Sequence, residues 1–353
     1  MIPSILYVAS MDMEPDRDSH WVKAFTQAGF ETNVFSTSKR LGYDSSQSGK
    51  VKRRLHIGKN ISELRRQLIE EVKNLKPDWV HFRLPMIFDR STISAIKDEC
   101  PLVTEYCNDD PFSPLRVKWY WRLFHSTIPL FDAHFIYRAN NHDDFKEHGA
   151  RHVLHAAPFF VPSRHNPPQW KDGEYEHFRS NAAFIGHWED DNRLAAIDAL
   201  VLSGFNVVLK GGMWDKACRN HPAERLLPVL PAYGETYKKI YAATAAGLCF
   251  FSKINRDQMT ERALEIPAVG GLLVCERTDE IISIYKDREE AFFFTDLDEL
   301  THIVSLVSQN DDLRKTVAVA GRKRLLAGKH TIDDRLVEIL DFLRSCDLLE
   351  SNA

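Results

Sequence analysis

Residues 233–275 have the sequence YGETYKKIYAATAAGLCFFSKINRDQMTERALEIPAVGGLLVC. The amphipathic stretch 235–246 predicts a helix, and the apolar run GLCFFS at 247–252 predicts a buried strand. A second helix is expected at 259–268, and the run GLLVC at 271–275 predicts the next strand. Helices that alternate with short apolar strands in this way indicate a parallel sheet with helical crossover connections.

The same alternation continues on both sides of this segment. Further strands are expected at 5–9, 31–36, 79–82, 101–106, 132–137, 182–186, 206–210 and 291–295. Further helices are expected at 20–28, 60–75, 141–148, 192–202, 297–309, 311–327 and 333–344. Asn60 and Glu63 have the spacing of a capping box at a helix start. Residues 37–54 are polar and basic and are expected to form a mobile loop.

A proline-rich stretch divides the chain. Residues 156–180 contain prolines at 158, 162, 167 and 168 and have no clear periodicity, so we expect a linker there. The pattern predicts an α/β protein of two Rossmann-like domains that face each other across a cleft, at about 1–158 and 170–332. In such sheets ligands bind at the carboxyl ends of the strands.

The composition excludes several classes of protein. The 353 residues include 46 Lys and Arg and 50 Asp and Glu, which gives a net charge of −4. This charge argues against a protein that generally coats nucleic acid or membranes. No apolar stretch approaches the ~18–20 residues of a membrane span. The N-terminus has the pattern of a strand and lacks the basic region of a signal peptide. The six cysteines include no CxxC pair and are expected to be reduced thiols. We therefore expect a cytoplasmic protein without stable membrane insertion.

Several common site motifs are missing from the sequence. It has no GxGxxG after the first strand and no GxxxxGK[ST], which argues against a dinucleotide site of the usual kind and against a P-loop. It also has no HExxH, no paired CxxC and no GxSxG. The 15 histidines are scattered without the spacing of metal ligands, so we expect no metal site.

The densest polar segment is 253–262, between two expected strands. It lies at the carboxyl end of a strand and leads into a helix N-terminus, a place where phosphate binds well. Lys253, Arg256 and Arg262 could neutralise a diphosphate, and the carboxylate of Glu265, about one turn further on, suits the hydroxyls of a ribose. The alternative interpretation is a charged helix start exposed to solvent.

Several stretches resemble one family. The segment RDQMTERALEIPAVGGLL (256–273) is similar to the CgeB-like (spore maturation protein) branch of group-1-type GT-B glycosyltransferases, in which a D/E-x7-E element precedes an A-x-G-G turn. Asp257 and Glu265 fit that element. The resemblance extends over about residues 100–345. It includes VTEYCNDDP (103–111), AAFIGHWEDDNR (182–193), VVLKGGMW (207–214) and GRKRLLAGKHTIDDRLVEIL (321–340).

The resemblance implies a GT-B glycosyltransferase that transfers a hexosyl group from a nucleotide-diphospho-sugar without a metal or other cofactor. Glu265 would bind the ribose, and Asp257, a shorter side chain than glutamate, would lie near the sugar. Arg193, Lys253 and Arg262 would hold the diphosphate, and the base would pack near 211–214 and Tyr233. The last helix, 333–353, would pack back on the first domain. The expected donor-binding residues are Gly186, His187, Arg193, Gly211, Trp214, Tyr233, Lys253, Arg256, Thr260, Arg262 and Glu265.

The first domain would bind the acceptor. Asp109 and Asp110, at the end of a strand, and His20, at a helix start, are candidate bases. Asp110 could instead cap a turn before a proline. The relatives favour a retaining mechanism, in which leaving-phosphate oxygens could accept the proton. The run 116–122 could contact an acceptor or be a half-buried helix with basic side chains at its edge.

Two other functions remain open. The chain could be a sugar-nucleotide epimerase or hydrolase on the same fold, or a GT-B-like module that binds a nucleotide without turnover. The acceptor could be a glycan, a peptide, a lipid-linked molecule or a nucleic acid. The sequence does not identify the nucleotide, the sugar, the stereochemistry or the oligomeric state.

Overall fold

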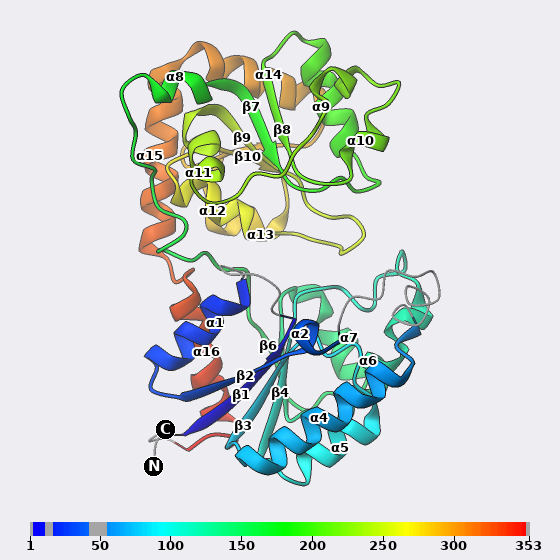
Figure 1. The fold of residues 1–353 in the computed structure, drawn as a ribbon. Helices are drawn as coiled ribbons and strands as arrows, with labels where there is room; N and C mark the ends of the chain where they lie inside the picture. The colour runs from blue at the N-terminus through cyan, green and yellow to red at the C-terminus, as the bar shows by residue number, and fades with distance from the viewer. Residues whose placement is uncertain (1–2, 11–16, 42–54, 351–353) are drawn as a thin grey trace. The chain divides into compact units, whose positions relative to one another are not determined.

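The computed structural model describes residues 3–10, 17–41 and 55–350. The chain forms two compact units, one of Met1–Ala157 with Ile332–Ala353 and one of Pro158–Thr331 (Figure 1). Each unit contains a sheet with helices on both faces, and the paired strands that the structure describes are all parallel. The chain therefore consists of two Rossmann-like units.

The first unit has a six-stranded sheet in the order β2-β1-β3-β4-β5-β6. The strands are β1 (Ser4–Ala9), β2 (Glu31–Ser36), β3 (Trp79–Arg83), β4 (Leu102–Cys107), β5 (Ala133–Ile136) and β6 (Val153–His155). The helices are α1 (Arg17–Gln27), α2 (Thr37–Leu41), α4 (Lys59–Leu75), α5 (Arg90–Lys97), α6 (Arg122–Thr127), α7 (His142–Glu147) and α16 (Ile332–Ser345), with 3-10 turns η1 (Lys118–Trp121), η2 (Ile128–Leu130) and η3 (Ala139–Asn141).

Alternate residues of β1 face opposite layers of helices, as the pleat of a strand requires. Leu6 and Val8 lie in one buried cluster with Leu64 of α4. The Tyr7 ring is 6.1 Å from Phe25 of α1, on the other face. Helix α16 contacts α1 on that face, where the two lie side by side (Figure 1). The structure thus groups the C-terminal helix with the first unit.

The second unit has a five-stranded sheet in the order β11-β10-β9-β7-β8. The strands are β7 (Ser180–Ile185), β8 (Val207–Lys210), β9 (Thr244–Cys249), β10 (Leu273–Glu276) and β11 (Phe292–Phe294). The helices are α8 (Glu174–Phe178), α9 (Arg193–Leu202), α10 (Trp214–Ala217), α11 (Gly234–Ala243), α12 (Arg262–Ala268), α13 (Asp279–Ile284), α14 (Leu297–Gln309) and α15 (Asp311–Ala327), with the 3-10 turn η4 (Pro222–Leu226).

Both faces of the second sheet are buried. Phe184 and Leu248 pack with Ile197 of α9 and Val304 of α14 in one cluster. On the other face, a side chain at Gly247 would lie 2.8 Å from Ile266 of α12, so the glycine lets this helix approach the sheet closely. Helix α11 covers the same face, because its Tyr241 ring lies 3.2 Å from the same Cβ position.

Four sequence predictions need correction. Residues 37–41 form helix α2, and the rest of the expected loop, 42–54, lies outside the described residues. Gly58 is the N-cap of α4 without a side-chain cap, so the predicted capping box is wrong. Strand β9 begins at 244, before the predicted 247, because small residues continue the buried run. Helix α8, at 174–178, lies within the expected linker, and strand β6, at 153–155, was not predicted.

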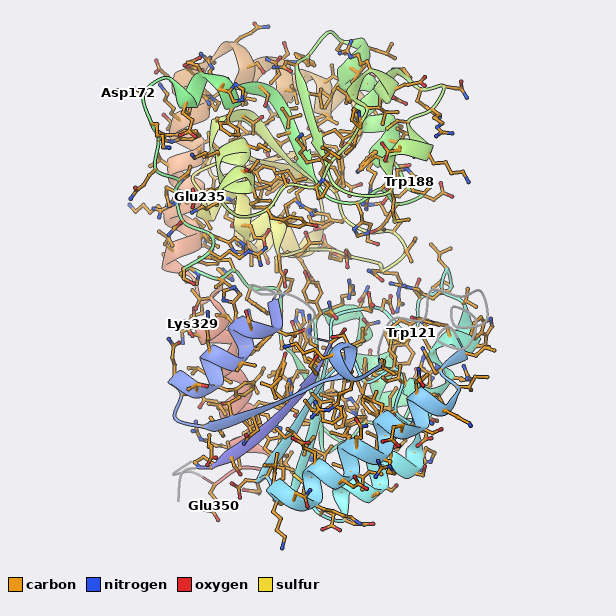
Figure 2. The ribbon with its side chains drawn as sticks, in the orientation of Figure 1. Trp121, Asp172, Trp188, Glu235, Lys329 and Glu350 are labelled. Atoms are coloured by element: carbon orange, nitrogen blue, oxygen red, sulfur yellow. The ribbon has the colours of Figure 1, made fainter. Side chains whose placement is uncertain are left out.

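The run 116–122 forms a short 3-10 turn, η1, followed by the start of α6. Trp121, labelled in Figure 2, is buried, whereas Trp119 is 39% exposed. Arg122 donates to the carbonyl of Trp119 at 3.0 Å. The aromatic side chains of this run are therefore divided between the core and the surface, and they do not share one face of a long helix.

Candidate functional site

The sheet of the second unit has a topological switch point between β7 and β9. Strand β8 follows β7 on one side of it, and the chain then crosses to β9 on the other side. In open parallel sheets the crevice for ligands lies at the carboxyl ends of the two strands that flank such a point. The loops that leave these ends are 186–192 and 250–261. They contain five of the eleven residues expected to bind a donor: Gly186, His187, Lys253, Arg256 and Thr260.

The first of these loops is packed tightly against the loop after β8. Gly211 has φ +137°, and a Cβ there would lie 1.9 Å from the Gly186 carbonyl oxygen. That oxygen accepts a hydrogen bond from the Trp214 indole at 2.8 Å. Trp188, labelled in Figure 2, donates its backbone N–H to Gly212 at 2.9 Å. The two glycines thus bring the backbones into contact.

The structure corrects the prediction for the nucleobase. Trp214 is fully buried, so its ring is part of the core and its indole N–H fixes the Gly186 carbonyl. Tyr233, at the N-cap of α11, is 72% exposed. A base can therefore stack on Tyr233 without rearrangement of the core, but not on Trp214.

Arg262, the first residue of α12, lies against Gly186. A Cβ on this glycine would be 3.0 Å from Arg262 Nη2. The guanidinium carbon lies 5.1 Å from the centre of the Phe184 ring. Arg262 Nε is shielded from solvent and finds no hydrogen-bond acceptor within the described part of the chain. Arginine remains charged in proteins, so the end of β7 holds a positive charge with an unused donor.

Glu265 lies one turn further along α12 and is held by two donors. The Tyr237 hydroxyl donates to Glu265 Oε2 at 2.5 Å. Burial, and then the charge of Glu265, raise the pKa of Tyr237 well above its ordinary value, so this hydroxyl stays protonated. His165 Nε2 lies 3.3 Å from Glu265 Oε1, and its Nδ1 accepts the N–H of Val161, so Nε2 carries the proton. Both partners orient the carboxylate.

The Arg193 prediction also needs correction. This guanidinium is 4% exposed and forms two hydrogen bonds, at 2.8 and 2.7 Å, with the Asp191 carboxylate. It also donates to the His187 carbonyl at 2.7 Å and lies 3.4 Å from Glu189. Two carboxylates therefore neutralise Arg193, and it fixes the loop after β7. The His187 side chain is 63% exposed and pairs with Glu189 at 3.1 Å.

The loop after β9 is closed by its own backbone. The N–H of Asp257 donates to the Ser252 carbonyl at 2.9 Å, and Arg256 has a left-handed backbone with φ 50°. Lys253 pairs with Glu276 at 2.9 Å, which offsets its charge. The Thr260 hydroxyl lies 3.5 Å from Cys249 Sγ. These contacts hold the loop in one conformation, and they leave Lys253 less suited to a diphosphate than Arg262.

The helix N-terminus differs from the expected one. Helix α12 begins at 262 and has seven residues, whereas the sequence predicted a start at 259. Glu261 occupies the N-cap position and is 9% exposed. A buried carboxylate at this position opposes an anion there. The guanidinium of Arg262, not the helix end, is therefore the group that can bind phosphate.

Sequence reasoning missed the link between the two loops. Ser252 donates its hydroxyl to Glu189 Oε2 at 2.5 Å, across 63 residues of sequence. Glu189 lies in an acidic run next to His187 and Arg193, and that run was the signal available in the sequence. Tyr237 and His165, which hold Glu265, were missed too, because they come from separate segments.

Glu189 gives a prediction about pH. Burial raises its pKa, but hydrogen bonds from His187 and Ser252 and the charge of Arg193 outweigh burial and lower the pKa from 4.5 to about 2. A pKa lowered on folding adds stability above the unfolded value and loses it as the pH falls toward the folded value. Glu189→Gln is expected to lower the free energy of unfolding by about 2 kcal/mol at pH 7.

The difference in free energy of unfolding between Glu189→Gln and the parent protein should shrink as the pH falls from 5 toward 3. Urea denaturation at pH 7, 5 and 3.5 measures it. Glu289→Gln, at a side chain that is 70% exposed, is the control and should change stability little at any of these pH values. A constant difference between Glu189→Gln and the parent across this range would contradict the proposed pairing.

The candidate bases of the first unit lie in different environments. Asp110 is fully buried and accepts from the Phe112 N–H at 3.0 Å and from Asn141 at 2.8 Å. It therefore caps the turn, and the prediction that it is a base is corrected. Asp109 pairs with Arg116 at 3.1 Å. His20, on α1, is 8% exposed.

A further polar cluster lies at the carboxyl ends of β1 and β3, the switch point of the first sheet. The Tyr7 hydroxyl donates to Asp18 at 2.7 Å, and Arg83 lies 3.3 Å from the same oxygen. The Arg83 guanidinium also lies 4.7 Å from the centre of the Tyr106 ring. Sequence analysis did not identify this cluster, because its members come from four elements.

In the described ranges, no group of three or more His, Cys, Asp or Glu side chains is arranged to hold a metal ion. The six cysteines are free thiols. Among the helices that the structure describes, none combines the length and apolar character needed to span a membrane.

The match to a known protein family lies mainly in the second unit. The profile of a family described as glycosyl transferase-like matches residues 192–341, from the end of the first loop into α16. No curated protein matches the chain.

Solved structures resemble the whole chain. Sucrose-phosphate synthase from Thermosynechococcus elongatus superposes with a TM-score of 0.67 at 9% identity, over 98% of this chain and 99% of that one. Anabaena HepE in complex with UDP-glucose gives 0.64 at 12% identity, over 97% and 99%. A putative UDP-N-acetylglucosamine 2-epimerase from Listeria monocytogenes gives 0.57 at 10%, over 98% and 97%. The chain therefore has the GT-B fold.

Proposed function

We propose that this protein is a glycosyltransferase that binds a nucleotide-diphospho-sugar in its second unit and transfers the hexosyl group to an acceptor. The observation that carries the proposal is the Arg262 guanidinium at the end of β7, which has an unused donor. The match of residues 192–341 to a glycosyl transferase-like family supports it. So does the UDP-glucose bound to HepE, a protein of the same fold. The finer resemblance to the CgeB-like branch is part of the proposal.

Arg262 suits a diphosphate for two reasons. A guanidinium can donate two parallel hydrogen bonds to phosphate oxygens. In a site shielded from water, such a bond is stronger than at a surface, and it can stabilise the charge that develops on a leaving nucleoside diphosphate. This charge stabilisation is the role that a metal ion plays in other transferases, so the proposed reaction uses no metal.

Glu265 is the proposed ribose ligand. Each carboxylate oxygen has two lone pairs, so bonds from Tyr237 and His165 leave acceptor capacity for vicinal hydroxyls. The two donors also fix the carboxylate before the ligand arrives, which reduces the entropy lost on binding. The proposal places Asp257 near the sugar and Tyr233 near the base.

The acceptor step is proposed to retain configuration. The acceptor proton would pass to an oxygen of the leaving phosphate, so no side chain is assigned as the base. If a side chain of the first unit does act as the base, Asp109 and His20 remain the candidates. The free thiols favour a cytoplasmic location, where thiols stay reduced. The acceptor, which could be a glycan, a peptide, a lipid-linked molecule or a nucleic acid, is to be identified by a transfer assay with candidate acceptors.

A comparison of two ligands tests the donor site. Glu265→Gln is expected to weaken UDP binding about 10-fold, because the ribose loses a charged acceptor, and to leave the binding of inorganic pyrophosphate unchanged. Titration calorimetry without Mg²⁺ measures both, after a screen of UDP, GDP, dTDP, ADP and CMP by thermal shift. Equal losses for UDP and pyrophosphate would contradict the assignment of Glu265 to the ribose. No response to any nucleotide would favour a module without turnover.

The likeness to the Listeria protein favours one rival, a sugar-nucleotide epimerase. An epimerase or hydrolase converts the sugar nucleotide with no acceptor present, whereas a transferase consumes it slowly until the acceptor is added. These activities are distinguished by analysis of the products formed from the sugar nucleotide that carries the bound nucleotide, with and without candidate acceptors. Rapid conversion without an acceptor would overturn the transferase proposal.

A further inference from the structure

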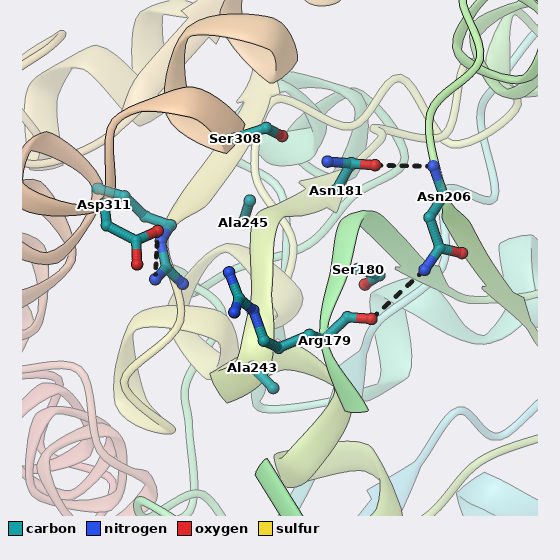
Figure 3. Close-up of a pocket in the computed structure, with 9 residues that line it drawn as sticks. Arg179, Ser180, Asn181, Asn206, Ala243, Ala245, Ser308 and Asp311 are labelled. Carbon is teal, nitrogen blue, oxygen red and sulfur yellow. Dashed lines mark hydrogen bonds and ion pairs between the residues drawn. The ribbon is translucent and has the colours of Figure 1, made fainter. Parts of the chain in front are cut away.

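A cavity of about 200 Å³ lies at the opposite edge of the second sheet, at the amino ends of β7 and β9 (Figure 3). It is lined by Arg179, Ser180, Asn181, Asn206, Ala243, Ala245, Ser308, Asp311 and Arg314. Strand β7 has six residues, so roughly 20 Å of strand separate this cavity from the candidate donor site. None of its lining residues belongs to that site.

The cavity has an excess of positive charge. Its lining includes two arginines and one aspartate, a formal balance of +1. Arg314 is 7% exposed, and it pairs with Asp311 at 3.0 Å and with the Tyr175 hydroxyl at 3.4 Å. Arg179 pairs with Glu176 at 3.1 Å, but that pair is half-exposed and contributes little.

Hydrogen-bond donors in this cavity also outnumber their acceptors. Arg314 Nε and the Ser308 hydroxyl are shielded from solvent, and neither has a hydrogen-bond partner among the described residues. Asn181 accepts the N–H of Asn206 through Oδ1 at 2.8 Å, which leaves its amide N–H groups as donors. Figure 3 shows Arg179 and Asn181, just before and at the start of β7, and Ser308, from α14, around the same space. Buried donors of this kind need an acceptor.

We propose that this cavity binds a small soluble phosphate monoester of a polyol. The phosphate would accept from Arg179, Arg314 and Ser308, and the hydroxyls would bond to the amides of Asn181 and Asn206. A cavity of about 150 Å³ holds a six-carbon ring, so this one accommodates a phosphate with a body of about three carbons. The small side chains of Ala243 and Ala245 leave that room.

Two substitutions with opposite expected effects test the proposal. Glycerol 3-phosphate is titrated by calorimetry into the full chain, with inorganic phosphate and glycerol as comparison ligands. Arg179→Gln should weaken binding about 10-fold, because a charged donor is lost. Asp311→Asn should tighten binding several-fold, because it removes the carboxylate that competes for Arg314. Both side chains are half-exposed, so the fold should tolerate these changes.

The donor site supplies the control. Arg262→Gln should leave the binding of glycerol 3-phosphate unchanged, and saturating UDP should not displace it. The proposal can therefore fail or succeed independently of the proposed glycosyltransfer. It is overturned if wild-type protein shows no saturable binding, if UDP competes, or if Arg179→Gln and Asp311→Asn change the affinity in the same direction. Binding of inorganic phosphate with no gain from the glycerol body would overturn the polyol part.

Discussion

Arg262→Gln is expected to weaken the binding of both UDP and inorganic pyrophosphate by about 100-fold, because removal of one member of a buried charge pair typically costs 2–5 kcal/mol. The guanidinium lies against Gly186 at the end of β7, and its Nε is shielded from solvent. Glutamine keeps a donor but removes the charge and the forked geometry. Titration calorimetry of the two ligands measures the loss, and both should be affected because the phosphates are what they share.

The unfolding temperature of the Arg262→Gln apoprotein should change little, because this guanidinium is half-buried and its shielded Nε has no hydrogen-bonded partner among the described residues. Arg225→Gln is the matched control. Arg225 is exposed and donates to the Phe205 carbonyl, near the amino end of β8. The control makes the same charge change at the other edge of the sheet and should leave ligand binding unchanged. Equal losses in both variants, or parent-like affinity in Arg262→Gln, would contradict the assignment.

Gly211→Ala is expected to destabilise the second unit by about 3 kcal/mol or more, because two penalties combine. The new Cβ would lie 1.9 Å from the Gly186 carbonyl oxygen, a backbone atom that cannot rotate away. The backbone of residue 211 also has a φ of +137°, which side-chain-bearing residues rarely adopt. Relief requires separation of the loops after β7 and β8, which would break the Trp214 bond to Gly186.

Gly212→Ala tests the same substitution one residue later. A Cβ there meets no atom within 4 Å among the described residues, so stability should change by less than about 0.5 kcal/mol. Urea denaturation followed by tryptophan fluorescence compares the two variants with the parent. Ligand binding provides a second readout, because Gly211→Ala should also weaken UDP binding through Gly186 and Arg262. Similar stability of both variants would show that the contact between the two loops is looser than described.

The charges of the site show where sequence reasoning stopped. Arg193, Lys253 and Arg262 were equivalent candidates in the sequence, since each is a cation near an expected loop. The structure separates them: Asp191 and Glu189 neutralise Arg193, Glu276 pairs with Lys253, and the Nε of Arg262 has no partner in the described part. The partner of Lys253 lies on another strand, β10, and cannot be recognised from local spacing, whereas the partners of Arg193 lie two and four residues before it.

The aromatic residues show the same limit. Trp214 and Tyr233 were both expected near the base, and their sequence contexts do not distinguish a core ring from a surface ring. The fold buries Trp214 completely and leaves Tyr233 72% exposed. Tyr237 was not predicted to lie near the Glu265 carboxylate, because the two residues are 28 positions apart in sequence. In the structure the Tyr237 hydroxyl is 2.5 Å from that carboxylate.

The sequence by itself predicted two parallel α/β sheets, because strand and helix periodicities are local and repeat along the chain. The short elements β6, α2 and α8 were not predicted. It also placed the glycines, and the loop that leads to the helix of Glu265, at the ends of strands, where parallel sheets bind ligands. The tertiary structure decided which cations remain available, which rings are buried and which loops touch. Those properties depend on pairs such as Glu189 with Ser252 and Gly186 with Gly211, which only the folded sheet brings together.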